Sequence, residues 1–484
     1  MASIFLANLD ADAIGLGASC TRPDILNADR GDVVTGRKRI TLEADDAGDS
    51  IMGFTPMGPI QGTTTGTAQI SVSDCLACSG CVTSAESVLL AEQAAPKLAL
   101  LCLEGTVDVV LDRAALASVA QKFDSTPAEA LARLRQACSY APNLSVRRVV
   151  AATDAQDLQL LETLYEFQSR LARSDAGLAS CRDTPSSTMA VSSTSYKDTN
   201  NVVVEAGPAL VKDQAPLPLV TAQCPGVVCF LEKTAPHALP FLSSTKSPVA
   251  AAAALVKDAA VCFVGSCADK KLEGYRRDLS VEGKQDVSLV LTLSEFVEAI
   301  GADRLASSSV LPSPEDVRDT RVHAHDRASS GGYADFVFRC LSSAEPEWKR
   351  GRNADVVEAV LEREGLRPLK FAIATGFRNV QRVTAALKRT TPQYDFVELL
   401  ACPSGCANGG GLLKGDLIKE SRDEATARVA ATVRKAHEAP IHDPRSNDDP
   451  AVRAALRPQL HTRHHRVPDA DTSASAALSL GGKW

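Results

Sequence analysis

The sequence predicts an α/β fold built on parallel sheets, and two observations favour it. From about Lys97 onward, short apolar runs flanked by turn residues alternate with segments in which apolar residues recur at helical spacing. Strands that alternate with helices are joined by crossover connections, which leave neighbouring strands parallel. The length of 484 residues is enough for roughly two to four domains of about 150 residues each.

The predicted elements follow one another along this part of the chain, and no internal repeat is present. Seven apolar runs are predicted to form strands: KLALLCLEG, SVRRVVAAT, LPLVTAQ, VCFVG, DVSLVLT, LKFAIAT and YDFVELL. Helical spacing predicts helices over Pro127 to Ala137, Ala155 to Ala172, Phe296 onward, Ala354 to Glu364, Asn379 to Leu387 and Arg422 to His437.

The composition divides the chain into three predicted parts. Residues 21 to 74 are rich in Gly, Thr and Asp and weakly periodic, which indicates strands and loops of a small N-terminal domain over residues 1–95. The alternating pattern predicts α/β lobes over residues 96–437, with a loose Ser/Thr-rich loop at about 182–202. The tail, residues 438–484, contains Pro, Asp, Arg and His and is predicted to be disordered.

Charge and hydropathy exclude several classes of function. The net charge of −7, the pI of about 5.7 and the lack of a basic stripe argue against a nucleic-acid partner. The first residues carry Asp10 and Asp12 and no basic leader, so no secretory signal is predicted. The longest apolar stretch, Val249 to Val256, is too short to span a membrane. We therefore expect reduced thiols, in the cytosol or nucleus, for the 14 cysteines.

Three cysteines near the N-terminus form the compact run Cys75-Leu-Ala-Cys78-Ser-Gly-Cys81. Such a loop can surround an iron–sulfur cube and direct backbone N–H groups at its sulfides. Bacterial ferredoxins carry a further cysteine four residues on, where this chain has Ala85, so Cys20 is the candidate fourth ligand. Zinc is the alternative, but four-cysteine zinc sites usually present two separated pairs of thiolates.

Four more cysteines stand where an apolar run gives way to a turn: Cys224, Cys267, Cys402 and Cys406. In open α/β sheets, ligands bind outside the carboxyl ends of the strands, so three strands can bring these four sulfurs to one crevice. The three glycines after Cys406 allow close backbone approach to a bulky ligand, and no Gly-Lys-Ser/Thr follows them as a phosphate loop requires. Two sets of four thiolates are what two iron–sulfur clusters require. A disulfide framework is disfavoured because a chain of this length needs no covalent staples.

The segments TAQCPG, GSCADKKLE and ELLACPSGCANGGG resemble the three signature loops of the iron-only hydrogenase superfamily. CLACSGC, CPGVVCFLEK leading to LPFLSSTKSP, DVSLVLTLSEF and FAIATGFRNVQ are similar to its non-hydrogenase branch, the cytosolic iron–sulfur protein assembly factors or nuclear prelamin A recognition factor-like proteins. The resemblance covers roughly residues 1 to 437. It implies a two-lobed, hydrogenase-like core with a small N-terminal iron–sulfur domain.

The resemblance also implies the cofactors and their ligands. One 4Fe–4S cluster is expected on Cys20, Cys75, Cys78 and Cys81, and a second, buried between the lobes, on Cys224, Cys267, Cys402 and Cys406. Lys270 and Glu273 match the lysine and glutamate of the second hydrogenase loop.

Departures from the hydrogenase pattern bear on the activity. Gln223 stands where hydrogenases carry a proton-relaying cysteine, and an amide does not exchange protons near neutral pH. Leu400 replaces the methionine of the third loop, and Leu412-Leu413 replaces its Gln-Pro, whereas Val227 stands where family members usually have tryptophan and bears only on local packing. We therefore expect a protein without hydrogenase activity.

The resemblance implies a role between the scaffold ATPases that build clusters and the late-acting targeting complex that inserts them. Trp484 matches the C-terminal aromatic residue through which family members dock on that complex. The alternatives are an active hydrogenase or ferredoxin-linked oxidoreductase, and a zinc-stabilised interaction protein.

The remaining cysteines and histidines are expected to matter less. Cys229 is placed on the helix after Cys224, and Cys181 borders the polar loop. The others are predicted to be small buried hydrophobes (Cys102, Cys138, Cys262 and Cys340) or solvated tail residues (His461, His464 and His465).

Overall fold

The computed structural model describes residues 93–180, 196–197, 203–204, 215–256, 258–274, 276, 287–323, 331–342, 345–351, 353, 355–389, 392–413, 422–462, 464 and 466. The N-terminal cysteines Cys20, Cys75, Cys78 and Cys81 lie outside the described residues, as do Cys181, His465 and Trp484. Nearly all of the domain predicted for residues 1–95 and most of the loop predicted at 182–202 also lie outside them.

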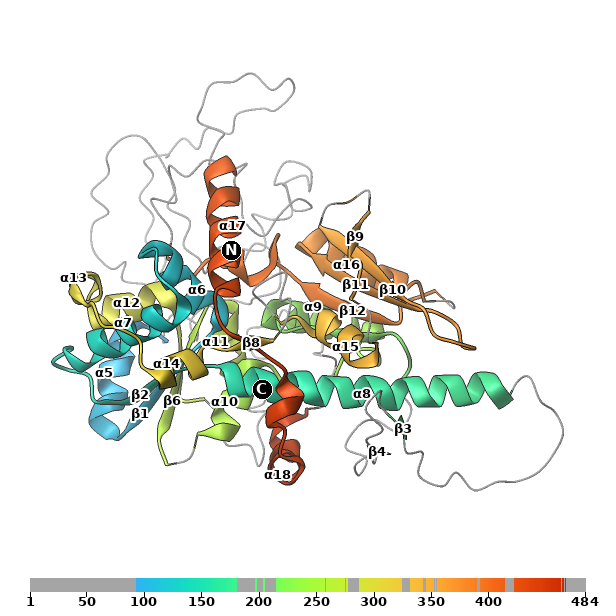
Figure 1. Ribbon diagram of the computed structural model, residues 1–484, viewed down its shortest axis with the longest axis horizontal. Helices are drawn as coiled ribbons and strands as arrows, with labels where there is room; N and C mark the ends of the chain where they lie inside the picture. The colour runs from blue at the N-terminus through green and yellow to red at the C-terminus, as the bar shows by residue number, and fades with distance from the viewer. Residues whose placement is uncertain are drawn as a thin grey trace, which may run out of the picture.

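The first lobe, at the left of Figure 1, is built on a four-stranded sheet in the order β2-β1-β6-β7. All its pairings are parallel, as predicted. Its core contains Val109, Cys262 and Leu291 from the strands and Leu131 and Phe296 from covering helices. The elements of this lobe are α5 (Ala95–Glu104), β1 (Val107–Leu111), α6 (Arg113–Lys122), α7 (Pro127–Ser139), β2 (Val146–Ala151), α10 (Pro248–Leu255), β6 (Ala260–Gly265), α11 (Asp269–Gly274), β7 (Leu289–Thr292), α12 (Leu293–Ile300), α13 (Ala302–Ser307) and α14 (Pro314–Asp319).

The second lobe, at the right of Figure 1, contains a five-stranded sheet in the order β5-β12-β11-β10-β9. The first three strands are parallel, whereas β10 and β9 add an antiparallel edge. Phe167, Phe371 and Phe396 form its aromatic centre, with ring centroids 5.3–5.8 Å apart. The elements are β5 (Leu219–Thr221), α9 (Pro225–Thr234), η1 (Pro236–Ala238), α15 (Tyr333–Leu341), β9 (Lys349–Arg350), β10 (Val356–Leu361), β11 (Leu369–Thr375), α16 (Phe377–Ala386), β12 (Phe396–Leu400) and η4 (Gly405–Asn408).

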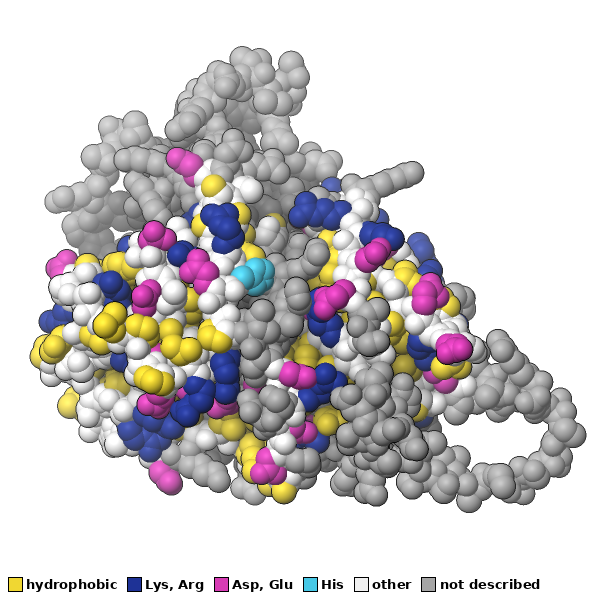
Figure 2. All heavy atoms as spheres, in the orientation of Figure 1, with side chains coloured by type: hydrophobic (Ala, Val, Ile, Leu, Met, Phe, Trp, Pro, Cys, Tyr) yellow, Lys and Arg dark blue, Asp and Glu magenta, His cyan; other side chains and the backbone are white. Residues whose placement is uncertain are grey.

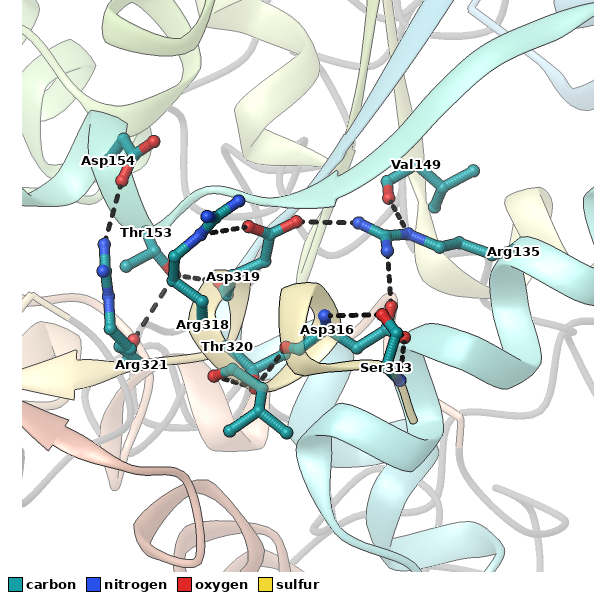
Figure 3. Close-up of polar contacts among 11 residues, drawn as sticks. Arg135, Val149, Thr153, Asp154, Ser313, Asp316, Arg318, Asp319, Thr320 and Arg321 are labelled. Atoms are coloured by element: carbon teal, nitrogen blue, oxygen red, sulfur yellow. Dashed lines mark hydrogen bonds and ion pairs between the residues drawn. The ribbon is translucent and has the colours of Figure 1, made fainter. Parts of the chain in front are cut away.

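Helix α8 (Thr153–Ser180) runs beneath both lobes (Figure 1). Ala155, near its start, packs in the core of the first lobe, and Leu164 and Phe167 pack in that of the second. Its first turn is attached to α14, because the Thr153 hydroxyl donates to the Asp319 carbonyl over 2.6 Å, and Arg135 of α7 forms ion pairs with Asp316 and Asp319 (Figure 3). Remaining elements are β3 (Tyr196–Lys197), β4 (Val203–Val204), β8 (Val322–His323), α17 (Arg422–His437), β13 (Ile441–His442), η5 (Pro444–Asn447) and α18 (Pro450–Leu460).

Two predicted elements are wrong. KLALLCLEG forms α5 rather than a strand, because Pro96 starts a helix in which Leu98 is buried while Leu100 and Leu103 stay exposed. The helix predicted over 354–364 is β10, because Val356 to Leu361 pair in register with β11. In both cases tertiary packing outweighs the local pattern.

The tail predicted to be disordered contains ordered structure from 441 to 462. Strand β13 pairs with β8, and helix α18 places Leu460 in the core of the first lobe. The histidines predicted to be solvated instead contact buried carboxylates, since His461 Nε2 lies 2.8 Å from Glu162 and His464 Nδ1 lies 3.4 Å from Glu232. Because Glu162 and Glu232 are buried, their contacts with His461 and His464 hold this part of the tail in place.

On the face drawn in Figure 2, basic and acidic side chains are interspersed. Among the described helices, none combines the length and the apolar character needed to cross a membrane.

Candidate metal centre

Cys224 lies at the carboxyl end of β5, where it is the N-cap residue of α9. Pro225 starts this helix, since its ring already has the helical φ and its missing N–H is not needed there. Burial and the charge of Asp269 together raise the pKa of the Cys224 thiol to about 11. The backbone N–H groups of Val227, Ala401 and Gly226 donate to the sulfur and oppose that shift. Such N–H groups also stabilise a metal-bound thiolate.

Cys267 follows β6 in the turn that leads into α11. Desolvation raises the pKa of its thiol well above the usual value, and the charges of Asp269, Cys224 and Cys406 add to this effect. The positive charge of Lys270 lowers the same pKa. Cys267 therefore lies in the same electrostatic environment as two other candidate ligands.

Cys402 and Cys406 follow β12 in a tight turn. Ser404 and Gly405 both have positive φ, 61° and 72°, and the Gly405 N–H donates to the Cys402 carbonyl over 3.0 Å. This left-handed step turns the chain so that Cys406 lies on the short helix η4, with both cysteines partly exposed.

The turns after β5, β6 and β12 bring the candidate cysteines toward one region, called the crevice, since the charges of Cys224 and Cys406 both act on Cys267. Cys224 and Cys402 are linked because Ala401, next to Cys402, donates its N–H to the Cys224 sulfur. The three glycines after Cys406, residues 409–411, lie directly on the turn before Cys267, since the Gly411 N–H donates to the Ser266 carbonyl over 2.9 Å. A Cβ on Gly409 would lie 2.2 Å from that oxygen, so only glycine permits this approach.

A single metal ion and a cluster require different arrangements of thiolates. Within the part of the chain that the structure describes, no group of three or more Cys, His, Asp or Glu side chains is close enough to hold one metal ion. A zinc site brings four sulfurs to about 2.3 Å from one ion. A 4Fe–4S cube spreads its ligands, because each iron takes one thiolate.

The site also contains a buried cation, Lys270. It contains two carboxylates, Asp112 and Asp269, that the sequence did not identify. Lys270 is 1% exposed, and its Nζ lies 3.3 Å from Asp112 Oδ2. Asp269 packs its carboxylate against Gly226, and burial raises its pKa to about 6. Neither carboxylate carries a distinctive sequence signal, because Asp112 resembles an ordinary helix N-cap more than 150 residues before Lys270 in the chain.

A pocket next to Cys224 is lined by Gln223, Cys229, Glu273 and His464, among others. Gln223 is 3% exposed, and its Oε1 has no hydrogen-bond partner among the described residues. Cys229 lies on α9, as predicted. Of the other cysteines, Cys138, Cys262 and Cys340 are buried as predicted, and Cys102 is only partly buried.

Comparison with known proteins decides the family. Residues 188–410 match the family described as iron only hydrogenase large subunit, C-terminal domain. Protein NAR1 of Arabidopsis thaliana is 31% identical over 84% of this chain and 88% of its own length. The chain belongs to the family of cytosolic iron–sulfur cluster assembly factors. Other relatives are the cytosolic Fe-S cluster assembly factor narfl of Xenopus tropicalis, 29% identical over 96% of both chains, and cytosolic iron-sulfur assembly component 3 of Rattus norvegicus, 32% identical over 84% of this chain and 83% of its own.

Solved structures of iron-only hydrogenases share the fold of this family member. The FeFe-hydrogenase HydA(deltaEFG) has a TM-score of 0.55 and 19% identity, over 77% of this chain and 99% of its own. HydA1 from Chlamydomonas reinhardtii has a TM-score of 0.54 and 18% identity over the same shares. The predicted hydrogenase-like α/β fold and the predicted family are therefore confirmed.

Proposed function

We propose that this protein is a component of the cytosolic iron–sulfur protein assembly machinery that binds two 4Fe–4S clusters. Two relatives, which this chain matches over most of their length, are named as a cytosolic Fe-S cluster assembly factor and a cytosolic iron-sulfur assembly component. The observation that supports the proposal for this chain is that the charges of Cys224 and Cys406 act on Cys267, while Ala401, the residue before Cys402, donates to the Cys224 sulfur. The N-terminal cluster, on Cys20, Cys75, Cys78 and Cys81, rests on the sequence alone.

The residues of the crevice suit a resident cluster. Four thiols supply one ligand for each iron, backbone N–H groups stabilise the thiolate of Cys224, and Lys270 offers a buried positive charge. When bound, the cluster would supply one-electron chemistry or structural cross-linking between the strand ends. Because the metal-free thiols of Cys224 and Cys267 have raised pKa values, binding must release protons from them.

Metal analysis of the anaerobically purified full chain tests the proposal. We expect about eight irons and eight sulfides per chain, and a low-temperature paramagnetic resonance signal after reduction, because each four-thiolate site takes one cube. Zinc without iron would overturn the proposal and support a zinc-stabilised interaction protein.

Hydrogen turnover is expected to be absent. Gln223 presents an amide where a proton relay would need an ionisable group, and an amide cannot supply or accept protons near neutral pH. Hydrogen evolution from reduced viologen by the loaded protein should equal that of its Cys406→Ser variant. Turnover in the wild type that this substitution abolishes would favour the hydrogenase or ferredoxin-linked oxidoreductase.

The partners in this proposal are the scaffold ATPases, which supply clusters, and the late-acting targeting complex, which inserts them. The cytosol is the expected compartment, since the relatives are named as cytosolic factors, and the cysteine content also suits the nucleus. Docking of Trp484 on the targeting complex belongs to the same proposal and rests on the sequence alone.

A further inference from the structure

The side chain of Lys270 is buried near the candidate cysteines and packs against a glycine. It lies on α11, three residues after Cys267, and its side chain is 1% exposed. The Lys270 side chain passes over Gly265 at the end of β6, where an added Cβ would lie 2.6 Å from Lys270 Cδ. A side chain at position 265 would displace the lysine, so the glycine makes room for it.

The ammonium group of Lys270 has hydrogen-bonding capacity that its protein neighbours leave unused. Its Nζ lies 3.3 Å from Asp112 Oδ2 and 5.7 Å from the centroid of the Phe263 ring. Among the described residues, this nitrogen donates no hydrogen bond. A buried ammonium carries three donors and is costly without partners. Thiolate and sulfide sulfurs at the crevice would be suitable acceptors.

The carboxylate that accompanies Lys270 is itself held in place. Asp112 Oδ1 accepts the N–H of Ala114 over 3.1 Å at the start of α6, and Oδ2 accepts the hydroxyl of Ser266 over 3.2 Å. Ser266 is the residue before Cys267, so the ion pair is attached directly to the turn that carries a candidate ligand. Both charges are therefore fixed with respect to the crevice.

Lys270 remains charged in this environment. Burial lowers its pKa, but the negative charge of Asp112 leads the interactions that more than offset burial and hold the pKa above its usual value; Cys406, Cys267 and Glu273 add to it when ionised. The same charge interactions show that Lys270 acts on two of the candidate ligands, Cys267 and Cys406.

We propose that Lys270, held by Asp112, is a fixed counter-charge that sets the reduction potential of the cluster on the C-terminal cysteines. The inference rests on the proposed function, because it requires a cluster at that site. Reduction adds one negative charge to the cluster. A fixed positive charge in a low-dielectric surrounding stabilises that added charge and raises the potential, while Asp112 partly opposes it.

Potentiometric titration followed by paramagnetic resonance tests the inference on the full chain, purified anaerobically. Lys270→Met keeps the length of the side chain without its charge and should shift the C-terminal cluster to a more negative potential. Asp112→Asn should shift it the other way. Lys271→Met is the matched control, since Lys271 is equally buried on α11 but pairs with Glu295 and the Gln93 carbonyl. We expect no change in potential for this control.

The outcomes separate this inference from the proposed function. A wild type without iron at the C-terminal cysteines would end both. A cluster retained at an unchanged potential in Lys270→Met and Asp112→Asn would overturn only the counter-charge. If Lys270→Met fails to fold, Asp112→Asn and the charge-retaining Lys270→Arg decide: an upward shift in the first with iron retained in the second supports the inference, and no shift in the first overturns it.

Discussion

Replacing Cys267 by serine is expected to remove the C-terminal cluster and about half of the bound iron and sulfide. Serine keeps the size of the side chain but replaces the soft thiolate with a hydroxyl that stays protonated near neutral pH. Cys267 lies in the turn after β6. It is next to Ser266, whose carbonyl accepts the N–H of Gly411. Iron and sulfide analysis of the anaerobically purified variant gives the result.

Cys229→Ser is the matched control for this variant. Cys229 is buried on α9, five residues after Cys224, and differs from the four cysteines of the crevice in lining the adjacent pocket. This variant should keep the iron content of the wild type. Full iron content in Cys267→Ser, or equal loss in both variants, would contradict the assignment of the four ligands.

Replacing Arg170 by methionine is expected to lower the free energy of unfolding by about 3–5 kcal/mol, because it leaves a buried carboxylate without its cation. Arg170 and Glu166 are 2% and 0% exposed on α8, with Nη2 and Oε1 2.5 Å apart. The guanidinium also donates to the carbonyls of Pro216, Phe241 and Leu242. Those contacts attach α8 to the loops around β5, which leads to Cys224. Denaturant unfolding of the two proteins measures the difference.

Two further variants identify the cause of that loss. Adding Glu166→Gln to Arg170→Met should recover part of the stability, since the unpaired buried charge is then gone. Arg445→Met removes an ion pair with Asp443 whose members are 35% and 45% exposed, and should cost no more than about 1 kcal/mol. A loss in Arg170→Met as small as that of Arg445→Met would show that the buried pair is not important for stability.

Much of the core could be predicted because its signals are local. The strand LKFAIAT has the bounds of β11, and the last predicted helix has those of α17. Burial on both faces makes a parallel strand a continuous apolar run, which is visible in the sequence. Cys224 and the Cys402/Cys406 turn follow β5 and β12, which are parallel neighbours and end at a shared edge. Cys267 follows β6, which belongs to the other sheet, so its place near them depends on how the two lobes pack.

The errors arose where local patterns and long-range contacts disagree. Helix α5 has apolar residues all round, so its periodicity did not distinguish it from a strand. Strand β10 exists because β11 pairs with it in antiparallel register. The order around His461 depends on Glu162, which lies about 300 residues away in the chain on α8.

The types and spacing of the cysteines, and the α/β alternation that carries them, are properties of the sequence itself, because turn chemistry and strand burial act over a few neighbouring residues. The charges around the crevice were decided only by tertiary structure. Asp112 is paired with Lys270 because strands β1 and β6 lie side by side in the sheet. Electrostatic interactions depend on distance in space and on burial, and neither is written in the order of the residues.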